Sequence, residues 1–99
     1  MIRLIPLVLL VAVITTPVSA ASALYRCALN MNIVANYSSD AKSVTIYVQG
    51  QTLQLPIAIS GSGARYSDGK TTFWEHQGQA LFEAPGVSFT GCKLIRLGY

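Results

Sequence analysis

The sequence predicts an all-β domain, an antiparallel sandwich or barrel of short strands. Apolar and polar residues alternate with a period of two through most of the chain after residue 25, and many are β-branched or aromatic. Turn-forming pairs such as Asp68-Gly69 and Pro85-Gly86 separate these segments. No useful stretch shows the helical period, so we expect any helix to be at most one short turn. Closing the sheet would remove its exposed edges.

Residues 1–20 have the pattern of a secretory signal peptide. Arg3 precedes an apolar run from Leu4 to Ile14, and small residues follow in Val18-Ser19-Ala20. The run is too short to cross a hydrocarbon layer of about 30 Å as a helix. A buried helix or a membrane anchor is the less favoured interpretation.

The expected mature domain covers residues 21–99, with cleavage after Ala20 and with Ala21 and Ala23 as alternatives. Loss of Arg3 leaves six Lys/Arg against four Asp/Glu, a net charge near +2. Nucleic-acid binding requires a concentrated basic patch, and we expect none. The remaining cations are dispersed along the sequence: Arg26, Lys42, Arg65, Lys70, Lys93 and Arg96.

The two cysteines, Cys27 and Cys92, lie near the two ends of the mature domain. Export permits a disulfide, which would tie the first strand to the last. The alternative is a lipid on Cys27. Small residues should precede a lipidated cysteine, whereas Tyr25-Arg26 precede this one, so we expect a soluble periplasmic protein without a stable membrane anchor.

Period-two alternation and turn residues set the expected strands. Gly50 ends one of them, and Pro56 marks an edge or a change of strand partner because it cannot donate a ladder hydrogen bond. Asp68-Gly69 predicts a two-residue type I′ hairpin turn. The strands are expected over 26–33, 44–49, 51–55, 65–67, 70–75, 80–83, 87–90 and 92–97.

The aromatic pair Phe73-Trp74 lies on one of these strands. Neighbouring strand residues point to opposite faces, so one ring should enter the core and the other should face outward or pack under a loop. The alternative is that both rings serve packing. Tyr66, across the turn, is expected to be a packing residue.

Ser62, Asp68 and His76 have the residue types of a hydrolytic triad. A triad also needs a Ser–His hydrogen bond, an acid behind the histidine and an oxyanion hole, and the Asp68-Gly69 turn already explains the aspartate. One histidine and two cysteines do not make a tetrahedral metal site. We therefore expect no enzyme activity, no metal and no cofactor.

The segment Ser60-Gly61-Ser62-Gly63 has two interpretations. Glycine adds backbone freedom, which suits a slack connection. The same residues also suit a thin loop that enters another protein's cleft with Ser62 at its tip.

Residues 60–78, SGSGARYSDGKTTFWEHQG, resemble the motif region of the MliC/PliC family, bacterial periplasmic or membrane-bound inhibitors of c-type lysozyme. The family pattern is S-G-A-R-Y followed by F-W-x-K-G. The resemblance implies an antiparallel β-barrel of about eight strands with one disulfide. It also implies loops that insert into the lysozyme cleft, where a serine and a lysine contact the two catalytic carboxyl groups.

Carried onto this chain, the family serine is Ser62, and Ser60 in the same loop is expected to contact lysozyme as well. The lysine does not carry over, because His76 holds its position and Gly78 comes one residue late. Either His76 makes the contact, or Arg65 or Lys70 replaces it, or the contact is missing.

The resemblance therefore predicts an inhibitor of c-type lysozyme that protects the cell wall from a host enzyme. Animal c-type lysozymes are usually basic and this chain is slightly basic, so association should be slow at low salt. The alternatives are a binding module in which Trp74 stacks on a cell-wall glycan or meets an envelope protein, and a structural envelope protein.

Overall fold

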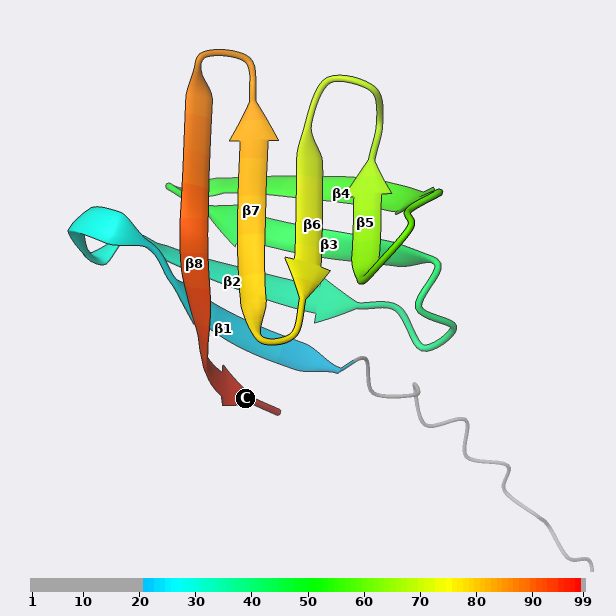
Figure 1. Cartoon of the computed structure of the whole chain (residues 1–99), viewed down its shortest axis with the longest axis horizontal. Coiled ribbons are helices and arrows are strands. Elements are labelled where there is room, and N and C mark those ends of the chain that lie inside the picture. Colours follow the sequence, from blue (N-terminus) through cyan, green and yellow to red (C-terminus); the bar gives the residue numbers. More distant parts are fainter. Residues whose placement is uncertain (1–20, 99) are drawn as a thin grey trace, which may run out of the picture.

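Eight antiparallel strands form a closed barrel in the computed structural model, which describes residues 21–98 (Figure 1). Each strand pairs with the next, and β8 pairs with β1, so the sheet has no free edge. Strands β5–β8 cross in front of β1–β4 in Figure 1. The predicted all-β barrel is confirmed, whereas the predicted signal peptide lies outside the described residues. The strands are β1 Ser22–Arg26, β2 Asn32–Tyr37, β3 Ser43–Val48, β4 Gln51–Ala58, β5 Ala64–Ser67, β6 Thr72–His76, β7 Gln79–Ala84 and β8 Val87–Leu97.

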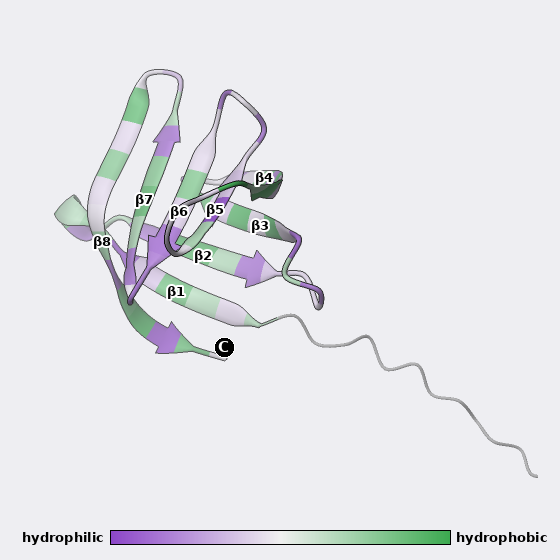
Figure 2. Ribbon diagram, turned by 45° about the vertical axis from the view of Figure 1, so that its right-hand side comes forward, coloured by the Kyte–Doolittle hydropathy of each residue, from purple (hydrophilic) through white to green (hydrophobic). Residues whose placement is uncertain are grey.

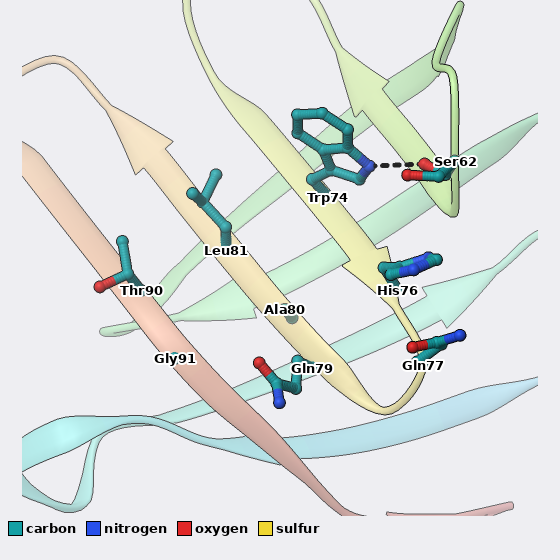
Figure 3. Close-up of a pocket in the computed structure, with 9 residues that line it drawn as sticks. All are labelled: Ser62, Trp74, His76, Gln77, Gln79, Ala80, Leu81, Thr90 and Gly91. Atoms are coloured by element: carbon teal, nitrogen blue, oxygen red, sulfur yellow. Dashed lines mark hydrogen bonds between the residues drawn. The ribbon is translucent and has the colours of Figure 1, made fainter.

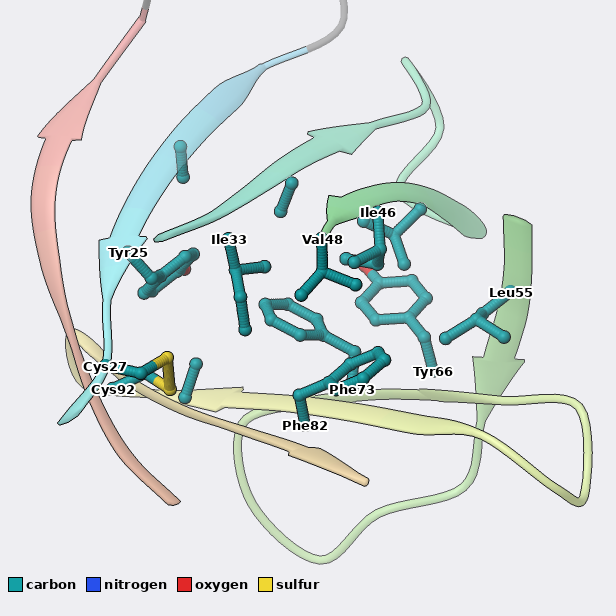
Figure 4. Close-up of a cluster of buried hydrophobic side chains, with 14 residues drawn as sticks. Tyr25, Cys27, Ile33, Ile46, Val48, Leu55, Tyr66, Phe73, Phe82 and Cys92 are labelled. Atoms are coloured by element: carbon teal, nitrogen blue, oxygen red, sulfur yellow. A yellow bond between two sulfur atoms is a disulfide. The ribbon is translucent and has the colours of Figure 1, made fainter. Parts of the chain in front are cut away.

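Inward-facing side chains from every strand fill the barrel (Figure 4), and bands of opposite hydropathy alternate along the strands (Figure 2). Phe73 is 0% exposed while Trp74 is 36% exposed, which confirms that the two rings face opposite sides of β6. Tyr66 is buried, as predicted, and its hydroxyl donates a hydrogen bond to the carbonyl oxygen of Ala41 at 3.0 Å.

The disulfide joins Cys27, which directly follows β1, to Cys92 in β8. Both residues are buried. The predicted link between the first and last strands is confirmed, and it fastens the pair of strands that closes the barrel. Within residues 21–98, no helix has the length and apolar character needed to cross a membrane.

The predicted strand over residues 26–33 is wrong. A short 3-10 turn, η1 Ala28–Asn30, separates β1 from β2, and Leu29 and Asn30 have φ angles of 61° and 60°. These left-handed conformations reverse the chain. Alternation alone misled the prediction, because Leu29 occupies an apolar position in the pattern yet is 95% exposed.

The Asp68-Gly69 turn also differs from its prediction. Ser67 pairs with Thr72, so four residues form the loop, and the Asp68 carboxylate accepts hydrogen bonds from the backbone N–H groups of Lys70 and Thr71 at 2.9 and 2.8 Å. These bonds lower the pKa of Asp68. An aspartate that bonds the backbone ahead of it favours this wider turn over a type I′ turn.

The two-residue left-handed turn occurs instead at Gln77-Gly78, between β6 and β7. Gln77 and Gly78 have φ angles of 52° and 79° between the paired residues His76 and Gln79. Both central residues of a type I′ turn require positive φ. This turn leads β6 directly back into β7.

Two further strand boundaries shift. Residues 87–97 form the single strand β8, because Gly91 (φ 66°) makes a bulge within it where the register against β7 changes. Strand β4 continues through Pro56 to Ala58. Pro56 is the last residue paired with β3, and the next residue pairs with β5, so the predicted change of partner is confirmed.

A buried and a half-buried tyrosine predict a loss of stability at high pH. The Tyr25 and Tyr37 hydroxyls lie 3.1 Å apart, and burial raises the pKa of both. A raised pKa in the folded state contributes stability that is complete below the unfolded value of about 10 and is lost as pH rises above it. We expect the urea midpoint to be level to about pH 9 and to fall beyond about pH 10. Tyr37→Phe should flatten this fall, and an equal fall in that variant would contradict the assignment.

Candidate functional site

The loop between β4 and β5, residues 59–63, is fastened to the outer face of β6. The indole N–H of Trp74 donates a hydrogen bond to the backbone carbonyl oxygen of Ser62 at 2.9 Å (Figure 3). Because Phe73 enters the core, the alternation of β6 fixes Trp74 on the outside. The loop is therefore held by a side chain of the rigid barrel.

Gly63 seats the same loop against the end of β6. A Cβ atom at this position would lie 2.3 Å from the carbonyl oxygen of Glu75 and 2.9 Å from the Cβ of His76. Its φ angle of 68° also favours glycine. Close approach and left-handed backbone explain the second glycine of the loop. Gly61 has no atom within 4 Å of its Cβ position, so nothing in the structure requires it.

Hydrogen bonds inside the loop fix its shape. The Ser60 hydroxyl donates to the carbonyl oxygen of Ser62 and accepts from the Ser62 backbone N–H at 3.2 Å. Ser60 is thus engaged within the loop. The Ser62 hydroxyl has no hydrogen-bond partner among residues 21–98 and is exposed, so it is open to an outside partner.

Two nitrogen-bearing side chains flank this loop. His76, at the end of β6, is exposed, and its Nδ1 lies 3.1 Å from the Cβ position of Gly63. The Arg65 guanidinium lies 6.0 Å from the centre of the Trp74 ring and donates to the carbonyl oxygen of Ile59 at 3.5 Å. The structure therefore brings Ser62, His76 and Arg65 to one place.

An open groove of about 380 Å³ extends from Ser62 across the outer face of β6, β7 and β8 (Figure 3). Sequence reasoning found Ser62, Trp74 and His76 but missed the β7 and β8 contributions. Trp74 lies directly opposite Leu81, so correct strand pairing would have identified that residue. The lining residues are Ser62, Trp74, His76, Gln77, Gln79, Ala80, Leu81, Thr90 and Gly91.

Other predicted residues lie elsewhere. Asp68, Gly69 and Lys70 form the turn at the far end of the β5–β6 hairpin from His76. No acid from this turn stands behind the histidine, so the triad of Ser62, Asp68 and His76 is not assembled. In residues 21–98, no cluster of three His, Cys, Asp or Glu side chains could hold a metal ion.

Comparisons with known proteins identify relatives of this chain. A 50-residue segment is 34% identical to Lipoprotein LprI from Mycobacterium tuberculosis and from Mycobacterium bovis. The match covers 50% of this chain and 25% of those relatives. No solved structure matches the chain significantly. The MliC family, described as "Membrane-bound lysozyme-inhibitor of c-type lysozyme", matches residues 25–88. This match covers well over half of the chain and includes the whole β4–β5 loop and Trp74. The chain therefore belongs to this family.

Proposed function

We propose that this protein inhibits c-type lysozyme by inserting the loop of residues 59–63 into the enzyme's active-site cleft. Family membership supports inhibition as the general function. The observation that carries the finer mechanism is the Ser62 hydroxyl, which has no hydrogen-bond partner within residues 21–98, on a loop fixed by Trp74 and Gly63. A loop already held in its binding shape loses little conformational entropy on association.

The chemistry of the site suits the target. Lysozyme works with two carboxyl groups in different protonation states. A hydroxyl donates to a carboxylate or accepts from a carboxylic acid, so Ser62 can bond either group. Arg65 or a protonated His76 would pair with the ionised carboxylate. Occupying both groups would exclude the sugar.

His76 offers a test of the second polar contact. If its imidazole pairs with a lysozyme carboxylate, titration of His76→Ala with lysozyme should give a Kd roughly three- to tenfold above that of the native chain. An unchanged Kd would contradict a role for His76 in binding.

Trp74→Phe should weaken inhibition without unfolding the barrel. The ring remains but its hydrogen bond to Ser62 is lost, which is worth about 1 kcal/mol, so Kd should rise about three- to tenfold. Tyr47→Phe is the matched control, because it removes a hydroxyl from an exposed aromatic residue on β3. Equal Kd values for the two variants in lysozyme titrations would contradict the proposed role of the hydrogen bond from Trp74 to Ser62.

Lysis of bacterial cell walls by hen or human lysozyme tests the function itself. Added protein should reduce lysis in a dose-dependent manner.

The groove beside Trp74 supports a second candidate function, because its indole, amide and hydroxyl groups suit a cell-wall sugar. Binding to purified peptidoglycan with no effect on lysozyme would favour that function. Export to the periplasm remains part of the proposal.

A further inference from the structure

The turn between β1 and β2 holds a leucine in a conformation that costs energy. Leu29 has φ 61° and ψ 28°, a left-handed conformation that is uncommon for bulky residues. Its side chain is 95% exposed, so no packing within residues 21–98 offsets this cost. Asparagine or glycine would suit the turn better. A strained and exposed leucine suggests a role outside the domain.

Barrel closure also gathers cations that look dispersed in the sequence. Arg26 on β1 lies directly opposite Lys93 on β8, and Arg96 lies opposite Leu24 further along the same pair of strands. Like charges directly opposite one another destabilise a sheet. Neither β1, η1 nor β8 contains an aspartate or a glutamate.

Apolar side chains accompany these cations. Ile95, also on β8, is 49% exposed. We call this surface the β1–β8 seam; it consists of Arg26, Leu29, Lys93, Ile95 and Arg96. It combines a positive strip with an exposed aliphatic side chain and a projecting leucine.

We infer that the β1–β8 seam docks on the surface of a bilayer that contains anionic phospholipid. Lipid phosphates would relieve the repulsion between Arg26 and Lys93, and Leu29 would enter the boundary between headgroups and acyl chains. The cations are spread along two strands beside aliphatic side chains, which fits an extended amphipathic surface better than a compact anion. This inference does not rest on lysozyme inhibition.

Docking in this way would leave the proposed inhibitory site open. In Figure 1 the η1 turn and the β4–β5 loop lie on opposite sides of the barrel. A seam resting on lipid would therefore keep the Ser62 loop in solution, where it could meet a soluble enzyme.

Vesicle co-sedimentation of the full chain tests the inference. Vesicles of phosphatidylcholine with about one-third phosphatidylglycerol should retain the protein, and added salt should reduce the retention. Lys93→Glu should lower partitioning about tenfold or more, since each cation near an anionic surface contributes about fivefold. Lys42→Glu and Lys70→Glu change the charge equally but lie in turns outside the seam, so they should have smaller effects. All variants share the same N-terminal segment, so differences among them report on the seam.

Leu29→Asn gives a second test, in which vesicle partitioning and the melting temperature should change in opposite directions. Partitioning should fall roughly tenfold, whereas the melting temperature should rise because asparagine tolerates the left-handed turn. Ile59→Asn is the matched control, since Ile59 is also 95% exposed but lies on the β4–β5 loop. Equal retention on pure phosphatidylcholine, equal losses for Lys42→Glu and Lys93→Glu, or unchanged partitioning of Leu29→Asn would overturn the inference.

Discussion

Gly63→Ala is expected to displace the β4–β5 loop and to destabilise the barrel. The new Cβ would lie 2.3 Å from the carbonyl oxygen of Glu75, a backbone atom that cannot move without distorting β6. The left-handed φ of 68° adds a cost for alanine. Together these effects should destabilise by about 2 to 5 kcal/mol, which lowers the melting temperature by roughly 10 °C or more in a domain of this size.

Inhibition should fall further than stability alone explains. The loop can relieve the clash only by leaving its seat beside His76, so Kd for lysozyme should rise at least about tenfold at temperatures where the variant is still folded. Gly61→Ala is the control in the same loop, because its Cβ position has no atom within 4 Å and its φ is not left-handed. Similar losses in both variants would show that the loop merely needs flexibility.

Ser62→Ala is expected to remove most of the inhibition and leave folding unchanged. The hydroxyl makes no hydrogen bond within residues 21–98, so its loss should move the melting temperature very little. In the proposed complex it bonds a catalytic carboxyl group, and a hydrogen bond to a charged group contributes about 1.5 to 3 kcal/mol. Kd should therefore rise roughly 10- to 100-fold.

The matched control for Ser62→Ala is Ser88→Ala. Ser88 is also an exposed serine without a side-chain hydrogen bond in the described part of the chain, but it lies on β8 near the β7–β8 turn. Titration calorimetry of both variants with lysozyme separates the loop from general surface effects. Native affinity of Ser62→Ala for lysozyme would contradict the loop mechanism but would not affect the assignment to the family.

Much of the barrel could be predicted because it depends on local patterns. Alternation identified the β3 and β6–β7 strands, and it placed Phe73 and Trp74 on opposite faces. The disulfide followed from two cysteines near the ends of a domain that was expected to be exported. These features depend only on neighbouring residues, on the two-residue period of β-strands and on the compartments in which disulfides form.

The failures arise where backbone conformation overrides composition. Leu29 has the residue type of a strand interior but adopts a left-handed turn, because the disulfide and the β1–β2 and β1–β8 pairing fix the chain on either side. Gly91 looked like a break between strands but forms a bulge inside β8. Only long-range pairing distinguishes these alternatives, and one sequence does not show that pairing.

The candidate site was predictable by residue type but not by arrangement. Resemblance identified Ser62, whereas the contacts of Trp74 and Gly63 that hold its loop depend on where the β4–β5 connection meets β6. Lys70 seemed an equal candidate for the missing lysine. The register of the β5–β6 hairpin places it at the other end of the strand, which leaves His76 and Arg65 beside the loop.

The most direct test is competition for the lysozyme cleft. Binding of the protein to c-type lysozyme would be measured with the cleft empty and with it filled by a saturating N-acetylglucosamine oligomer, which occupies the substrate site. We expect tight binding to the empty enzyme and loss of this binding when the sugar is present. Binding of equal strength to the sugar-filled enzyme, or no binding to either form, would contradict the claim that the Ser62 loop enters the active site.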